Sequence, residues 1–137
     1  MKNIVAIDVG NSETTVGVGN NSSWRSYRYT TRKTITSDEL FMMFKTTIDP
    51  DSINDENLDG SIICSVVPQI TESVVEATER FTSKKVYTVG PGIKTGLKVN
   101  IDNPKELGPD RIANSVGGFK MAQKSVIIVD LGTATTF

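Results

Sequence analysis

Two segments near opposite ends of the chain follow the same residue pattern. Ile4–Ser12 reads IVAIDVGNS and Val126–Ala134 reads VIIVDLGTA, so an apolar run, an aspartate, an apolar residue, a glycine and two small residues recur in the same order. A short β-branched run followed by a glycine is typical of a buried strand that ends in a turn. The repeat predicts two units of one type, a first domain over 1–124 and the first strand and loop of a truncated second domain over 125–137.

The patterns between these segments predict an α/β fold. Helices are expected from the capping box Thr36–Glu39, around the apolar stripe over 70–81, and after Asp110. A polar loop is expected over 49–59. Strands are expected over 4–7, 14–18, 24–30, 61–67, 85–89 and 125–129. An antiparallel meander followed by alternating helix and strand indicates a mixed sheet covered by helices.

The residue inventory excludes several kinds of chemistry. The chain of 137 residues has no histidine, one cysteine and a formal net charge of −1. The lack of histidine excludes a Ser-His-Asp triad, and one cysteine permits neither an internal disulfide nor a thiolate zinc site. Cys64 is expected to be a buried small hydrophobe. The balanced charge argues against nucleic-acid or membrane-surface binding, and no apolar run is long enough to span a bilayer, so a cytoplasmic location is expected.

The two Asp-x-Gly turns indicate phosphate binding. Gly10 and Gly132 lack a Cβ, so an anion can approach the main-chain N–H groups there. Asp8 and Asp130 would repel a phosphate directly and therefore imply an intervening Mg²⁺ or ordered water. One such turn is more often a simple hairpin turn, but two at matching strand ends could clamp a single polyphosphate. Small polar residues that can add donors follow the glycines: Asn11, Ser12 and Thr133.

Several segments together resemble the type III pantothenate kinase family, within the superfamily of acetate kinase, sugar kinases, actin and heat-shock chaperones. The resemblance implies a ribonuclease H-like, actin-type ATPase domain and the start of a duplicated second one. Members of that family are longer proteins built from two such halves, so this chain is expected to be the amino-terminal half. The matching segments are collinear: Asp8–Ser12, Ser65–Pro68, Gly90–Leu97, Asp102–Pro104, Gly108–Asn114 and Asp130–Thr136.

The resemblance also implies a reaction, the ATP-dependent phosphorylation of pantothenate to 4'-phosphopantothenate, which is the first step of coenzyme A biosynthesis. Asp8 would organise Mg²⁺ beside the phosphates, and Asp130 would bind a monovalent cation, K⁺ or NH₄⁺. Asp110 would act as the general base, while Gly108 and Arg111 would hold pantothenate. The two phosphate loops would comprise Gly10, Asn11 and Ser12 in the first and Gly132 and Thr133 in the second.

Other interpretations of these residues stay open. Asp110 could be only the N-cap of the following helix, and Arg111 only a surface cation. The protein could also be a non-catalytic accessory factor of the same fold, or a kinase for another acceptor. The resemblance implies a homodimer for the full-length protein and an inactive isolated half. Four positions depart from the usual family pattern and bear more on acceptor specificity than on ATP binding: Glu13, Cys64, Ile101 and Pro109.

Overall fold

A five-stranded mixed sheet forms the centre of the structure, a computed structural model that describes residues 2–53, 56–90, 92–132 and 134–137. The strand order is β3-β2-β1-β4-β5, with β1, β2 and β3 antiparallel and β4 and β5 added in parallel. The strands are β1 (Asn3–Val9), β2 (Glu13–Gly19), β3 (Trp24–Thr30), β4 (Leu58–Ser65) and β5 (Val86–Thr88). This arrangement confirms the predicted α/β fold and is consistent with a ribonuclease H-like domain.

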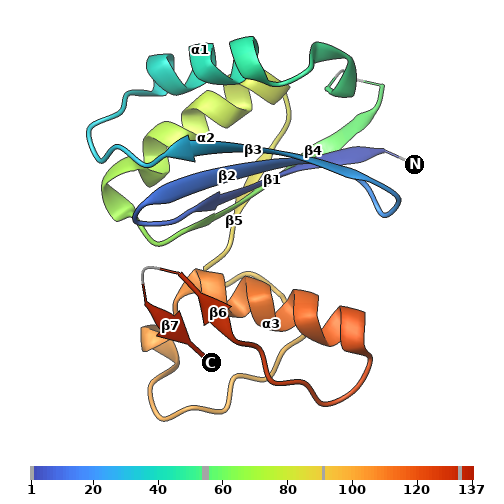
Figure 1. Ribbon diagram of the computed structural model, residues 1–137, viewed down its shortest axis with the longest axis vertical. Coiled ribbons are helices and arrows are strands. Elements are labelled where there is room, and N and C mark those ends of the chain that lie inside the picture. Colours follow the sequence, from blue (N-terminus) through green and yellow to red (C-terminus); the bar gives the residue numbers. More distant parts are fainter. Residues whose placement is uncertain (1, 54–55, 91, 133) are drawn as a thin grey trace.

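Two helices, α1 (Ser37–Thr47) and α2 (Pro68–Thr82), cover one face of the sheet (Figure 1). The capping box predicted for α1 is confirmed, since the Thr36 hydroxyl accepts from the Glu39 N–H at 3.2 Å and the Glu39 carboxylate accepts from the Thr36 N–H at 3.0 Å. Phe44 of α1 packs against the rings of Tyr29 and Phe81, with centroids 6.0 and 5.8 Å away. No helix in the described part of the chain is long and apolar enough to cross a membrane.

Strand β1 separates the two faces of the sheet through the alternation of its side chains. Val5, Ile7 and Val9 are at most 3% exposed and belong to the core that α1 and α2 complete. Ala6 and Asp8 point to the opposite face. The hydrophobic core therefore occupies one face of the sheet and leaves the other face available for a site.

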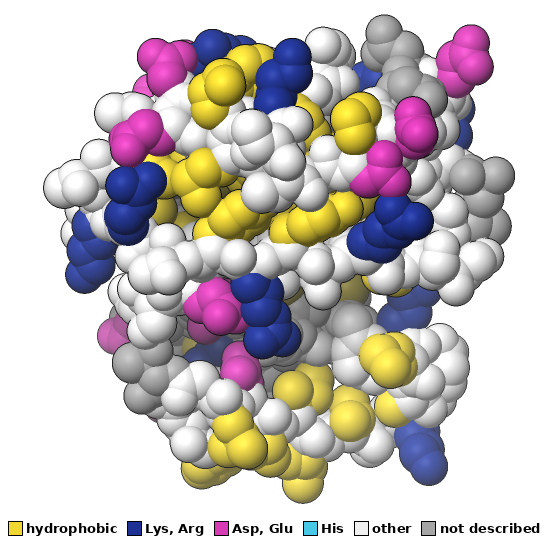
Figure 2. All heavy atoms as spheres, turned by 45° about the horizontal axis from the view of Figure 1, so that its top comes forward, with side chains coloured by type: hydrophobic (Ala, Val, Ile, Leu, Met, Phe, Trp, Pro, Cys, Tyr) yellow, Lys and Arg dark blue, Asp and Glu magenta, His cyan; other side chains and the backbone are white. Residues whose placement is uncertain are grey.

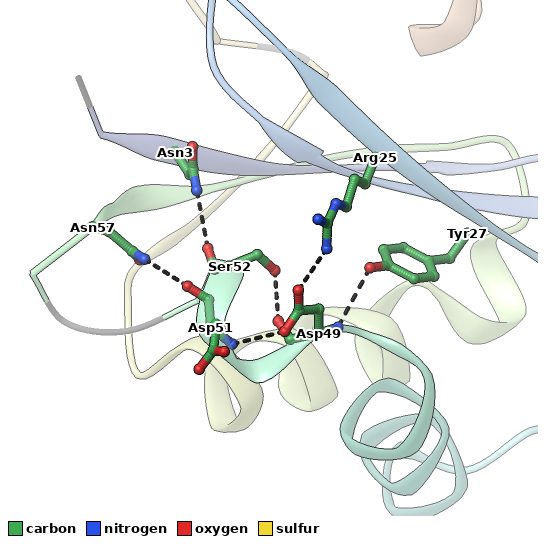
Figure 3. Close-up of polar contacts among 7 residues, drawn as sticks. All are labelled: Asn3, Arg25, Tyr27, Asp49, Asp51, Ser52 and Asn57. Carbon is green, nitrogen blue, oxygen red and sulfur yellow. Dashed lines mark hydrogen bonds and ion pairs between the residues drawn. The ribbon is translucent and has the colours of Figure 1, made fainter.

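The segment between α1 and β4 is tied to the sheet by polar contacts (Figure 3). It was expected to be a loop over 49–59, but it contains the short 3₁₀ helix η1 (Pro50–Ser52), and β4 starts at Leu58. The Arg25 guanidinium of β3 donates to the Asp49 carboxylate at 2.5 Å, and the Asn3 amide of β1 donates to the Ser52 carbonyl at 3.0 Å. These contacts give Arg25 a structural role at the end of the sheet opposite to the Asp8 turn.

Helix α3 (Pro109–Ala122) lies on the other side of the sheet from α1 and α2 (Figure 1), after a largely irregular segment that includes η2 (Pro104–Glu106). The hairpin β6 (Asp130–Leu131) and β7 (Thr135–Thr136) lies beside it. Hydrophobic side chains gather on this part of the molecule in Figure 2. The exposed ones are Phe119, Met121, Val126, Ile127, Val129, Leu131 and Phe137.

The predicted strand over 125–129 is wrong. Only Asp130–Leu131 has strand pairing, and its partner is the two-residue strand β7. The corresponding strand β1 has neighbours on both edges, whereas no described residue pairs with 125–129. The segment instead packs on α3, where a Cβ added to Gly118 would lie 2.6 Å from Ile128 Cδ1. A β-branched run alone does not make a strand, because the hydrogen bonds of a strand need a second segment.

Candidate active site

A cleft of about 1070 Å³ separates the open face of the sheet from α3 and the β6–β7 hairpin. Figure 2 shows acidic and basic side chains between the upper and lower parts of the molecule. The sheet side of the cleft includes Ala6, Asp8, Thr15, Gly17 and Cys64. The opposite wall includes Asp110, Asn114, Asp130 and Gly132. Side chains that are far apart in the sequence, and most of the predicted site residues, therefore face one space.

The carboxyl group of Asp8 is affected by burial and by two other carboxylates in this cleft. Burial raises the pKa of its carboxyl above the usual 3.8, and the negative charges of Asp110 and Asp130 raise it further. Cys64 is the partner of Asp8 across the β1–β4 pair, and a hydrogen bond between the thiol and the carboxylate offsets part of that rise. Burial, the negative charges of Asp8 and Asp110, and the hydrogen bond to Asp8 raise the pKa of Cys64 to about 12, so it stays a thiol at neutral pH. Cys64 is buried as predicted, but it is also a hydrogen-bond donor.

Replacing Asp8 with asparagine should leave the protein at least as stable at about pH 7. Because this pKa is raised, the folded state binds more protons than the unfolded state between pH 3.8 and the pH that equals the pKa of Asp8 in the folded state. The free energy of unfolding therefore falls as the pH rises through that window. Asp8→Asn should remove this fall. Thermal denaturation followed by circular dichroism from about pH 4 to about pH 7 would measure it. The exposed Asp59 gives the control Asp59→Asn, and a clearly lower melting temperature for Asp8→Asn would contradict the electrostatic argument.

Asp110 is the second residue of α3 and not its N-cap, so the alternative that it only caps the helix is wrong. The N-cap is Gly108, and Pro109 takes the first helical position, where the missing N–H costs nothing. Oδ1 of Asp110 accepts from the Arg111 N–H at 2.8 Å. A Cβ on Gly108 would overlap Oδ1 of Asp110, so glycine makes room for the carboxylate. The local structure thus accommodates Pro109 and fixes Asp110 at the start of a helix that lines the cleft.

The two glycines of the predicted phosphate loops use their own N–H groups to close turns. Gly10 donates to the Glu13 carbonyl at 3.0 Å, and Gly132 donates to the Ala134 carbonyl at 3.2 Å. Donors to an anion must therefore come from neighbouring groups. Asn11 and Ser12 are exposed and line the cleft beside Gly10. The remaining predicted loop residue, Thr133, lies outside the described residues.

The oxygen donors around the cleft fit a cation that is shared with a ligand. Among the described residues, no group of three or more Asp, Glu or Cys side chains is placed to hold a metal ion by itself. Mg²⁺ at phosphate sites usually takes one or two carboxylates and completes its shell with phosphate oxygens and water. Asp8 and Asp130 match this donor type. They face one cleft, and the charge of Asp130 acts on Asp8.

Two polar residues of the cleft were not assigned a role from the sequence. The amide of Asn114 donates to Oδ2 of Asp130 at 2.9 Å, and Cys64 contacts Asp8 as described above. Asn114 follows Asp110 by four residues, a spacing that places both on one helix face, so this signal was available in the sequence. The register that sets Cys64 opposite Asp8 was not available, because it depends on strand pairing.

Comparisons with known proteins agree on one family. The family model described as "Type III pantothenate kinase" matches residues 4–137. Type III pantothenate kinases from Exiguobacterium sp. and Geotalea uraniireducens are 38% and 42% identical to the chain over 135 residues. In each case the match covers 98% of this chain and 53% of the relative. The chain therefore spans about half the length of the curated relatives it matches.

Proposed function

We propose that this chain, which belongs to the type III pantothenate kinase family, supplies the phosphate-binding and acceptor-activating side chains of an enzyme that phosphorylates pantothenate with ATP. The observation that supports this most is the convergence of Asp8, Asp110 and Asp130 on one cleft, where two of them raise the pKa of the third. Converging carboxylates with a perturbed pKa are a frequent property of catalytic sites. A purely structural surface gains nothing from such repulsion.

In the proposed reaction, the pantothenate hydroxyl lies against the carboxylate of Asp110, which accepts its proton as the hydroxyl oxygen attacks the γ-phosphorus of ATP. The bond from this phosphorus to the bridging oxygen breaks, and ADP leaves. Bound Mg²⁺ and K⁺ would neutralise phosphate charge, with Asp8 holding the first and Asp130 the second. Arg111 is exposed beside the base and would pair with the carboxylate of pantothenate. Gly108 would also contact pantothenate, although neither Gly108 nor Arg111 is among the residues that line the cleft.

The same proposal covers the phosphate loops and the domain organisation. Gly10, Asn11 and Ser12 would line the phosphates from the sheet side, and Gly132 and Thr133 would do so from the other side. Residues 1–124 would form the first domain, and 125–137 would begin a second. We propose that the chain alone is inactive, because it spans only 53% of the length of its relatives. For the full-length protein we propose a cytoplasmic homodimer.

The test is the formation of phosphopantothenate from ATP, Mg²⁺, K⁺ and pantothenate, measured by mass spectrometry for this chain and for any longer reading frame that contains it. We expect product from the longer protein and none from the chain. ATP binding is measured in parallel by calorimetry. A longer protein that binds ATP but forms no product would overturn the kinase proposal. It would favour an accessory factor or another acceptor, and Ile101 and Glu13 would then be the first positions to examine.

A further inference from the structure

We propose that Asn114 is a positioning residue that orients the carboxylate of Asp130 toward a bound monovalent cation. The amide Nδ2 of Asn114 donates to Oδ2 of Asp130 at 2.9 Å, and both residues line the cleft. This inference rests on the proposed function, which gives Asp130 the role of a cation ligand. It adds the group that sets the direction of that ligand.

The need for such a group follows from the short strand that carries Asp130. Strand β6 has two residues, and among the described residues its one strand partner is β7, which also has two. Asp8, by contrast, lies in a seven-residue strand with a neighbour on each side. The main chain therefore holds Asp130 less firmly than Asp8. The hydrogen bond from Asn114, which lies on the fourteen-residue helix α3, restricts the orientation of the Asp130 side chain further.

Helix α3 presents the required donor next to the proposed base. Asn114 and Asp110 are four residues apart, so they lie one turn apart on the same face, and both line the cleft. One rigid element thus sets the position of the Asp110 carboxylate and, through Asn114, that of the Asp130 carboxylate. The distance between the proposed base and the proposed cation ligand would then be fixed by a single helix.

The chemical type of the donor also suits this role. An asparagine amide is neutral, so it fixes a carboxylate oxygen without cancelling the charge that attracts a cation. A lysine or arginine at this place would form an ion pair with Asp130 and compete with the cation. Asn114 occupies Oδ2, while Oδ1 of Asp130 lies on the side of Gly132, 4.0 Å from where a Cβ of that glycine would be. One carboxylate oxygen is therefore left toward the predicted phosphate loop.

The experiment uses thallium(I), a probe for potassium sites, and measures its affinity by thallium NMR for the full chain with ATP and Mg²⁺ present, because the described carboxylates do not hold a metal ion by themselves. Asn114→Ala should weaken thallium(I) binding about tenfold, the size of effect that is typical when a partner of a metal ligand is removed. Its melting temperature should stay close to that of the wild type, because Asn114 is exposed. Lys120→Ala is the matched control, since Lys120 is exposed on the same helix and does not line the cleft. It should bind thallium(I) like the wild type.

Asp130→Asn separates the failure of this inference from the failure of the proposed function. If Asp130→Asn loses thallium(I) binding and Asn114→Ala keeps the wild-type affinity, the cation role of Asp130 stands and the positioning role of Asn114 is overturned. If the wild type binds no thallium(I), or if Asp130→Asn binds it as well as the wild type, the cation role itself fails and the inference fails with it. Weaker binding in both variants supports both statements.

Discussion

Replacing Asp110 with asparagine should lower the rate of phosphopantothenate formation by about 10²- to 10⁴-fold, the usual contribution of a general base. Asparagine has the same shape, and its carbonyl oxygen can still accept from the Arg111 N–H as Oδ1 does now. It cannot accept a proton from the acceptor hydroxyl. We therefore expect kcat to fall while the KM for pantothenate changes little. Steady-state kinetics on a longer protein that contains this chain and forms the product would measure both.

A second carboxylate on another surface provides the control for this variant. Glu79 is exposed on α2, on the face of the sheet that holds the core, so Glu79→Gln should leave kcat unchanged. ATP affinity should be kept in Asp110→Asn, or increase slightly, because one of the negative charges that act on Asp8 is gone. If Asp110→Asn kept a rate within about threefold of the wild type, Asp110 would not be the general base.

Sequence patterns that reflect short-range interactions correctly predicted elements of the five-stranded sheet and of the helices that cover it. The alternation in Trp24–Thr30 corresponds to a half-solvated edge strand, and the Thr36–Glu39 capping box marks the start of α1. Both patterns depend on residues a few positions apart, where side-chain and backbone preferences act directly. Pro68 directly follows the predicted strand over 61–67 and begins α2, which a proline at the first helical position allows.

Features that depend on distant partners could not be predicted in the same way. The run over 125–129 has the composition of β1 but lacks strand neighbours among the described residues, so its side chains rest on α3 instead. The start of α3 was expected after Asp110, but the helix begins at Pro109 with Gly108 as its N-cap, since proline is well suited to the first helical position. The contact between Cys64 and Asp8 follows from the parallel pairing of β1 with β4, which composition does not reveal.

The candidate site depends both on local sequence patterns and on contacts between distant segments. Asp8 and Asp130 were selected from local motifs and Asp110 from the family resemblance, but their convergence comes from topology. Strand β1 presents Asp8 near its carboxyl end, on the face opposite the core, and α3 returns beneath that face with Asp110 at its start. The strand end of an open α/β sheet is a common place for ligand sites. The sequence motifs identify the residue types, and the topology brings those residues together, so both are needed to predict the cleft.

Replacing Phe44 with alanine should destabilise the protein by about 3–5 kcal/mol, the largest effect on stability that we expect from a single side chain. Phe44 is 1% exposed and fills the space between α1, α2 and the sheet, where it contacts the rings of Tyr29 and Phe81. Its loss leaves a cavity that rigid neighbours cannot close. Urea denaturation followed by circular dichroism measures the free energy of unfolding.

Phe41→Ala is the matched control, because it removes the same side chain three positions earlier on the same helix. Phe41 is only partly buried and lies under the cations of Lys45 and Arg80, at 5.4 and 4.6 Å from its ring centre. Its replacement should cost about 1 kcal/mol. An equal loss in both variants would contradict a core placed between the helix pair and the sheet. A large difference would show that side chains fully buried between α1, α2 and the sheet contribute much of the stability.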